Sequence, residues 1–296
     1  HTETVPRLVS IPVDYDVYGN TAGIQVEYEY SEPFILNADD TLTTYETFVY
    51  VHQKDCFSTL SHFSNYMQTK GIKPASPEPG AFEPVWCAWG YERDFTVQQI
   101  LNTLPKVKEL GIKWAGLDDG FQQAEGDWHT NKERFPNGDA DMKAFVDSIH
   151  ANGMKAILWW APLAADPGSN ILKKDPNLTL LQKDGSPQFI SWWDSYMMSP
   201  TYKGTLKTTE ETVKLFMHDW GFDALRLDGQ HMNACAPDYN DAHELEYPEQ
   251  SSEQMPLLFK ALFETAKKIK PNAVIGFCPC GDCMSFYHMP YTNKFV

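Results

Sequence analysis

The chain has 296 residues, of which 42% are hydrophobic, and a formal net charge of −16. A chain of this length and composition can bury a sizeable core, which excludes an intrinsically disordered protein. The negative charge disfavours phosphate backbones and anionic bilayers, so we expect neither nucleic acid nor a membrane as a partner and favour a neutral substrate.

The first 80 residues combine extended segments with one helix. Residues 23–30 (GIQVEYEY) alternate apolar and polar side chains, and residues 46–53 form another extended run, so both are predicted to be antiparallel strands. From Cys56 to Lys70, apolar residues recur at helical spacing, and Gly71 ends the predicted helix.

A proline-rich segment separates this part from the rest of the chain. Four prolines and Gly80 lie between residues 72 and 84, a composition that interrupts both helices and strands and is typical of a domain junction. We therefore predict two domains, a β-rich one with its linker over residues 1–80 and a second one over residues 81–296.

The second domain alternates short apolar runs with amphipathic stretches, as βα units around a parallel sheet do. The predicted strands are VWCAW (85–89), KWAGLD (113–118), KAILWWA (155–161), ALRLD (224–228) and AVIGF (273–277). The predicted helices cover residues 96–110, 141–152, 205–220 and 252–269. A closed (β/α)8 TIM barrel has eight of each, so we expect an α/β fold with the first five barrel strands.

The carboxyl ends of these strands carry polar and aromatic residues. In a parallel barrel, functional side chains gather at these ends, because the loops that follow line one open face. The groups are Asp118-Asp119-Gly120, Trp159-Trp160, Arg226-Leu227-Asp228-Gly229-Gln230 and Cys278-Pro279-Cys280-Gly281-Asp282-Cys283. We therefore expect a functional site where they meet.

Asp228 is the strongest catalytic candidate in this set. Strand geometry places Asp228 and Arg226 on the same inward-facing side, and a neighbouring cation favours the ionised carboxylate. An ionised carboxylate near an open rim suits a glycosidase nucleophile, which attacks an anomeric carbon and later leaves it. A structural ion pair is the alternative interpretation.

Two further strand ends offer sugar-binding groups. Asp118 and Asp119 can accept hydrogen bonds from sugar hydroxyls, although a DDG sequence is also a common turn. Either Trp159 or Trp160 must face inward by strand alternation, and a barrel tryptophan is more often part of the core than a ligand platform.

The cysteines permit a metal hypothesis that we do not favour. Three of the six lie in one loop with CxCxxC spacing, which could bind zinc or an iron–sulfur cluster as thiolates. No second Cys or His pair with ligand spacing accompanies them, so we predict no metal and no cofactor. A disulfide framework is not expected at this length.

Several motifs occur in an order that matches one family. LDDGFQQAEGDWHTNKERFPNG (117–138) is followed by HANGMKAILWWAP (150–162), DPNL (175–178) and LRLDGQ (225–230), and then by the cysteine loop and SFYHMPYTN (285–293). Together they resemble glycoside hydrolase family 36, the α-galactosidases related to family 27. The resemblance covers about residues 85–296, and residues 1–80 resemble only the end of the family's β-sandwich domain.

The resemblance implies roles for the residues already singled out. Asp228 would be the catalytic nucleophile, Asp118 and Asp119 would bind galactose hydroxyls, and Trp159 would form a wall of the sugar site. Arg226, where the family usually has Lys, belongs to the same substrate site.

The cysteine loop is assigned to this site as well. Cys278, Cys280 and Gly281 would contribute to substrate binding, in place of the glycine-rich loop of commoner members. A second departure is Gly229-Gln230, where the family usually has Met-Asn. Both departures bear on which sugar the site accepts.

The acid/base carboxylate is expected after the sixth barrel strand, past Val296, by the same resemblance. The candidate within the chain is Asp282, which would have to stay protonated to act as the acid.

The predicted function is a retaining exo-acting hydrolase of terminal α-galactosides, acting on an α-galactoside oligosaccharide through a glycosyl-enzyme intermediate on Asp228. The alternatives are a transglycosylase, a hydrolase of another α-glycoside, and a non-catalytic glycan-binding protein. We expect a periplasmic or secreted location and leave a cytoplasmic one and homo-oligomerisation open.

Overall fold

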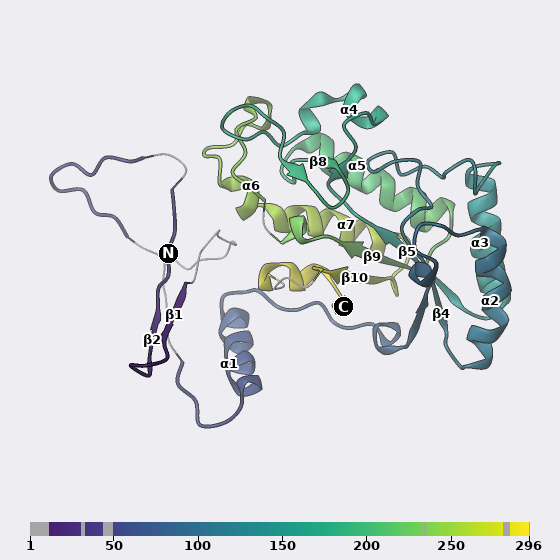
Figure 1. The fold of residues 1–296 in the computed structure, drawn as a ribbon, viewed down its shortest axis with the longest axis horizontal. Coiled ribbons are helices and arrows are strands. Elements are labelled where there is room, and N and C mark those ends of the chain that lie inside the picture. Colours follow the sequence, from purple (N-terminus) through teal and green to yellow (C-terminus); the bar gives the residue numbers. More distant parts are fainter. Residues whose placement is uncertain (1–11, 31–32, 44–49, 234, 281–284, 296) are drawn as a thin grey trace.

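The computed structural model of the chain describes residues 12–30, 33–43, 50–233, 235–280 and 285–295. Its centre is a curled sheet of six parallel strands in the order β11-β10-β9-β5-β4-β3 (Figure 1). The strands are β3 (Val85–Cys87), β4 (Trp114–Leu117), β5 (Lys155–Trp160), β9 (Ala224–Asp228), β10 (Val274–Cys278) and β11 (Lys294–Phe295). This confirms the α/β barrel prediction and adds the start of a sixth strand.

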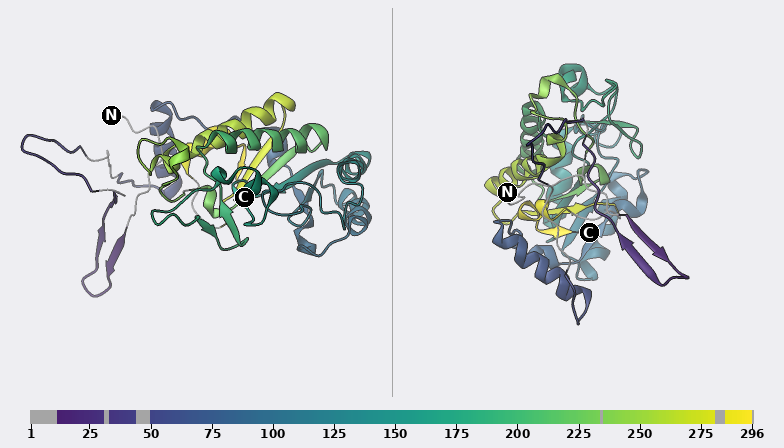
Figure 2. Two further views of the ribbon diagram at one scale, coloured as in Figure 1. Left: turned by 90° about the horizontal axis from the view of Figure 1, so that it is seen from above. Right: turned by 90° about the vertical axis from the view of Figure 1, so that its left-hand side faces the viewer.

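Helices cover the convex face of the sheet. They are α2 (Val97–Glu109), α3 (Asp139–Ala151), α5 (Lys203–Lys214) and α7 (Met255–Ile269). Two short helices, α4 (Asn170–Lys174) and α6 (Gln250–Glu253), lie in the connections. Helices α5 and α7 lie side by side (Figure 2), and a π-helical turn, Leu215–Asp219, extends α5. None of the helices formed by the described residues is both long and apolar enough to cross a bilayer.

Local sequence signals explain where these helices begin and end. Thr96 accepts a hydrogen bond from the Gln99 amide at 3.2 Å, and the Gln99 side chain accepts one from the Thr96 amide at 2.7 Å, so a reciprocal cap starts α2. Gly111 and Gly153 follow α2 and α3 with positive φ values of 76°, a conformation that glycine adopts without a Cβ penalty.

Strand alternation divides the sheet into two chemically different faces. The outward side chains, such as Leu158, Leu225 and Phe277, are 1% exposed or less and form the main core with the helices. At the amino ends of the strands, inward side chains such as Val85, Ala224 and Val274 are small or apolar. The inward side chains become polar toward the carboxyl ends, where Arg226 and Asp228 lie.

The N-terminal part has less strand structure than predicted. β1 (Val13–Asp16) and β2 (Thr21–Ile24) form an exposed antiparallel hairpin that projects away from the sheet (Figures 1 and 2). Only the start of the predicted 23–30 strand is confirmed, and residues 50–53 are not strand, because no described segment offers them ladder partners. Residues 46–49 of the second predicted strand lie outside the described residues.

The predicted helix before the proline-rich segment is present as α1 (Cys56–Thr69), and Gly71 follows it with φ of 89°. Phe63 of α1 meets Phe286 edge to face at 5.4 Å between ring centroids. The Ala75 amide also donates to the carbonyl of Met289 at 2.8 Å, so this segment contacts the barrel part. The boundary between residues 80 and 81, and the assignment to a β-sandwich, stay predictions.

Candidate active site

A cavity of about 510 Å³ opens at the carboxyl ends of the strands. It brings together every predicted site residue that the structure describes, from four strand ends: Asp118, Asp119, Trp159, Arg226, Asp228, Cys278 and Cys280. The predicted residues Gly281 and Asp282 lie outside the described residues. The sequence therefore predicted where the side chains meet, and their catalytic and binding roles stay predictions.

Sheet register explains why these residues converge. Asp228 pairs with Cys278 across β9 and β10, and Arg226 pairs with Trp159 across β5 and β9. Paired residues in neighbouring parallel strands point to the same face, so two adjacent levels of the sheet supply the floor of the cavity. Trp159, not Trp160, is the tryptophan that faces the cavity.

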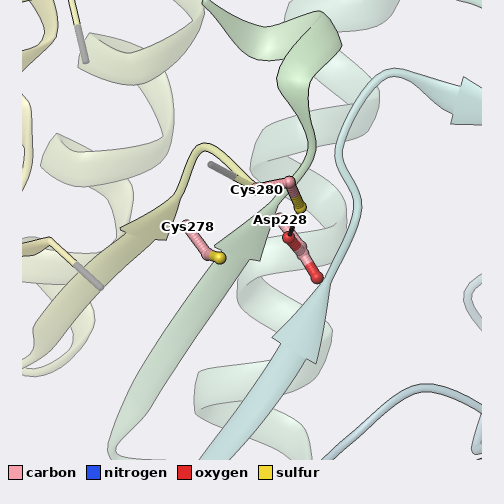
Figure 3. A group of neighbouring side chains, drawn as sticks. All are labelled: Asp228, Cys278 and Cys280. Atoms are coloured by element: carbon pink, nitrogen blue, oxygen red, sulfur yellow. Dashed lines mark hydrogen bonds between the residues drawn. The ribbon is translucent and has the colours of Figure 1, made fainter. Parts of the chain in front are cut away.

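Asp228 is held by contacts to both carboxylate oxygens. The indole Nε1 of Trp159 donates to Oδ2 at 2.7 Å, and the thiol of Cys280 donates to Oδ1 at 2.7 Å (Figure 3). The Arg226 guanidinium lies 3.9 Å from Oδ2. With 13% of its side chain exposed, Asp228 is fixed in orientation yet open to the cavity.

Asp118 is a buried partner of Arg226. Its Oδ2 lies 3.1 Å from Nη1 of Arg226 and accepts the Cys87 thiol at 2.9 Å, while its Oδ1 accepts the Asp119 amide at 2.9 Å. Burial raises the pKa of Asp118, and the Arg226 charge opposes that shift. Burial, together with the Asp118 charge, also raises the pKa of the Cys87 thiol to about 11, so this thiol is a hydrogen-bond donor.

Asp119 is anchored by residues that the sequence analysis did not single out. Arg93 contacts its Oδ2 through Nε at 2.7 Å and Nη2 at 2.6 Å, and Gln122 donates to its Oδ1 at 2.7 Å. Arg134 in turn donates to the backbone carbonyls of Arg93 and Gly120. Reading the end of the first barrel strand by the rule used for the other four would have drawn attention to the region of Cys87 and Arg93.

Glu125 adds a titrating group beside this network. Its Oε1 accepts from Gln122 at 3.3 Å and lies 4.0 Å from Nη2 of Arg93. Burial and the neighbouring charge of Asp166 raise the pKa of Glu125 to about 7. Protonation of Glu125 near neutral pH therefore changes the charge next to Asp119.

One wall of the cavity is a small antiparallel sheet that the sequence analysis missed. It has the order β6-β8-β7, with β6 (Ala164–Ala165), β7 (Phe189–Ile190) and β8 (Ser195–Met197). The turn between β7 and β8 carries Trp193, whose ring lies 6.1 Å from that of Trp159, and Trp192, which is 77% exposed. The adjacent tryptophans in SWWDS were the available signal.

Gly229 accounts for one departure from the family pattern. It has φ of 127°, and a Cβ there would lie 2.2 Å from Cε1 of His231. His231 is partly buried, and its Nε2 lies 2.7 Å from the carbonyl oxygen of Pro162. Burial lowers the pKa of His231 to about 4, so the ring is neutral and donates this hydrogen bond. The larger Met that the family usually has at this position would require His231 to move.

The cysteine loop faces the nucleophile candidate. Cys278 and Cys280 each bring a sulfur to Asp228, and the three potential ligand atoms lie within 4.8 Å of one another (Figure 3). Burial and the contact with Asp228 raise the pKa of the Cys280 thiol to about 12, which keeps it a donor to the carboxylate. The structure thus adds an aspartate from β9 to what looked in sequence like a cysteine cluster alone.

A parallel barrel sheet with carboxylates and aromatic walls at the carboxyl ends of its strands is the arrangement of barrel glycoside hydrolases. Among the described residues, the cavity offers a carboxylate held at its floor, two more carboxylates that can accept hydroxyl hydrogen bonds, and flat apolar faces.

The chain belongs to the Melibiase family, whose model matches residues 48–289. It is 29% identical over 272 residues to an A type blood α-D-galactosamine galactosaminidase of Flavonifractor plautii, covering 88% of this chain and 25% of that protein. An α-galactosidase of Lactobacillus acidophilus is 33% identical over 91 residues, which are 28% of this chain and 12% of that one.

Solved structures share the fold. An α-galactosidase of Thermus thermophilus, in complex with p-nitrophenyl α-D-galactopyranoside, superposes with a TM-score of 0.61 at 23% identity, covering 79% of this chain and 44% of that one. A family 36 α-galactosidase of Geobacillus stearothermophilus, in complex with stachyose, gives a TM-score of 0.64 at 17% identity, covering 78% and 33%. The chain thus spans less than half the length of these relatives.

Proposed function

We propose that this protein is a retaining glycoside hydrolase that removes terminal α-galactosyl residues, with Asp228 as the nucleophile. The observation that supports it most is the setting of Asp228. Its carboxylate is held by Trp159 and Cys280 at 2.7 Å each and shares one cavity with Asp118 and Asp119. Membership of the Melibiase family supports the same reaction.

The proposed reaction has two steps, formation of a glycosyl-enzyme intermediate and its hydrolysis. A carboxylate oxygen of Asp228 forms a bond to the anomeric carbon while the glycosidic bond breaks and a general acid protonates the leaving oxygen. A water molecule then attacks the same carbon from the opposite face and gives up a proton, which releases the sugar with its original configuration and restores the Asp228 carboxylate.

The other cavity residues take supporting roles in this proposal. Asp118 and Asp119 accept hydrogen bonds from sugar hydroxyls, and their anchoring by arginines fixes where those hydroxyls must lie. Trp159 walls the sugar site and orients Asp228. Cys278 and Cys280 line the same site.

The surroundings of the cavity support an oligosaccharide as the substrate. Exposed aromatic residues lie in its lining at Trp89, Phe189 and Trp192, which are 43%, 48% and 77% exposed. Such faces stack on successive sugar rings. The complex of the Geobacillus stearothermophilus enzyme with stachyose supports the same substrate class.

The test is hydrolysis of an aryl α-galactoside by the wild type and by Asp228→Asn. The substrate should carry a leaving group that departs without protonation, so that the assay reports on the nucleophile and not on the acid. We expect kcat/KM to fall by about a thousandfold or more, about 4 kcal/mol of transition-state stabilisation. Asp147→Asn is the matched control, since Asp147 is 58% exposed and pairs with Lys143 on α3. Equal activity of Asp228→Asn and the control would contradict the proposal.

A second candidate substrate is a terminal α-linked galactosamine. The relative aligned over 88% of this chain is named for that sugar, whereas the α-galactosidase of Lactobacillus acidophilus aligns over 28%. The described cavity lining holds three carboxylates and the guanidinium of Arg226, and Arg93 pairs with Asp119 from outside the lining. The remaining negative charge favours an ammonium group.

One comparison of three substrates distinguishes the two candidate sugars. Aryl α-galactoside, α-galactosaminide and N-acetyl-α-galactosaminide are compared by kcat/KM. A preference for the galactosaminide that weakens at high salt would favour the second candidate, because ionic attraction is screened. A preference for the neutral galactoside supports the first.

A further inference from the structure

Two cysteines and the proposed nucleophile form a cluster from neighbouring strands. Asp228 and Cys278 are paired across β9 and β10, and Cys280 lies two residues further along. The φ of 53° at Cys280 turns the loop back, so that its sulfur lies 2.7 Å from Oδ1 of Asp228. Figure 3 shows the two cysteines and the aspartate together at the ends of the two strands. Their potential ligand atoms all lie within 4.8 Å of one another.

This donor set matches the chemistry of a thiophilic divalent cation. Zinc binds thiolate sulfur at about 2.3 Å and carboxylate oxygen at about 2.0 Å, which in a tetrahedron separates neighbouring donor atoms by about 3.5 to 3.8 Å. The Cys280 sulfur lies 2.7 Å from Oδ1 of Asp228 and the three donor atoms lie within 4.8 Å of one another, so the cluster must rearrange by about 1 Å to reach these values. Three protein ligands leave a fourth position, and all three residues line the open cavity, so water and ions have access.

The two carboxylate oxygens of Asp228 have different contacts, and this leaves one of them available for a cation. Oδ2 accepts the Trp159 indole and lies nearest to Arg226, whereas Oδ1 faces the Cys280 thiol. A cation bound through Oδ1 therefore keeps the Trp159 hydrogen bond as an outer support, as liganding carboxylates usually have.

We propose that Asp228, Cys278 and Cys280 bind a thiophilic divalent cation such as Zn²⁺, and that this ion inhibits the enzyme by occupying the carboxylate needed for catalysis. The ion replaces both thiol protons, so that one cation enters and two protons leave. The inhibition depends on the proposed function of Asp228, but the binding does not.

The binding is tested with Cd²⁺, because thiolate-to-cadmium charge transfer gives an ultraviolet band that requires no catalytic activity. The wild type should bind one Cd²⁺ with the intensity of two thiolate bonds at this site, and the Cys278→Ser/Cys280→Ser double variant should lose that band. Cys56→Ser is the matched control and should keep it, because Cys56 is exposed at the start of α1, away from the cavity. Asp228→Asn should weaken Cd²⁺ binding by about tenfold or more.

If the double variant does not fold, each single serine variant should weaken binding by about tenfold. An undiminished band in both single variants, or in the double variant, overturns the metal site.

Enzyme activity tests the second part of the proposal, the inhibition by the bound ion. Zn²⁺ should inhibit aryl α-galactoside hydrolysis, and a chelator should restore it. A protein that binds Cd²⁺ at these cysteines but hydrolyses no α-glycoside would leave the site standing and refute the proposed function. An active protein that Zn²⁺ does not inhibit would refute the inhibitory role.

Discussion

The two ends of the same curled sheet serve different purposes. At the amino ends of the strands, Trp114, Ala224 and Val274 pack with Ala81 into a small apolar cluster, and Trp114 is 1% exposed. At the carboxyl ends, the same strands present Asp118, Arg226, Asp228 and Cys278 to an open cavity. Strand direction therefore separates the packed end from the open one. Substitutions at the amino ends should mainly lower the free energy of unfolding, and substitutions at the carboxyl ends should mainly lower activity.

Trp114→Ala at the closed end should produce the largest change, and it should be a change in stability. The indole is buried, and its Nε1 donates to Glu83 at 2.7 Å. Removing a buried tryptophan costs about 3 to 5 kcal/mol through lost burial and the remaining cavity. Urea unfolding followed by circular dichroism measures it, with Trp114→Phe expected to cost less.

A free energy of unfolding within about 1 kcal/mol of wild type for Trp114→Ala would contradict a stabilising role for the amino ends. Loss of affinity for aryl α-galactoside in the folded variant would contradict it as well.

Arg226→Met at the open end should mainly reduce activity. The guanidinium lies 3.1 Å from Asp118 and 3.9 Å from Asp228, so its loss removes the cation next to both carboxylates. We expect kcat/KM to fall by about a hundredfold, about 3 kcal/mol. Arg226→Lys keeps the charge and should retain activity within about tenfold of wild type. Equal losses in Met and Lys variants would mean that shape, not charge, matters here.

Glu125→Gln should produce the smallest effect, and one that depends on pH. The folded-state pKa of Glu125 is raised from 4.5 to about 7, so the protein binds this proton more tightly than the unfolded chain does. The stability associated with the proton is complete below about pH 4.5 and is lost as the pH rises through 7. Glutamine mimics the protonated form and should be more stable than wild type by about 1 kcal/mol at pH 8, with no difference at pH 4.

Thermal unfolding across this pH range measures the Glu125→Gln effect. A constant difference between the variant and the wild type at all pH values would refute the titration of Glu125.

The sequence predicted the barrel strands well, because each is an apolar run bounded by turn residues. ALRLD and KAILWWA coincide with β9 and β5 to within one residue. Their ends identified Asp228 and Trp159, because strand direction alone decides which end carries the loops that line the cavity.

Other parts of the site could not be predicted from local sequence patterns. β6, β7 and β8 have two or three residues each, too few to display a period of two. Arg93 reaches Asp119 across 26 positions in the chain, and only the folded geometry reveals that pairing. Of the alternating segment 23–30, only residues 23 and 24 belong to a strand among the described residues, because alternation indicates a strand only where partner strands pair with it.

The central claim is that an oxygen of Asp228 bonds to the anomeric carbon. The direct measurement is mass spectrometry of the protein after reaction with an activated fluorinated α-galactosyl probe, whose fluorine slows release of the sugar. We expect a single added fluorogalactosyl group on the peptide that contains Asp228 and none in Asp228→Asn. A label on another carboxylate, with Asp228 unmodified, would contradict this claim.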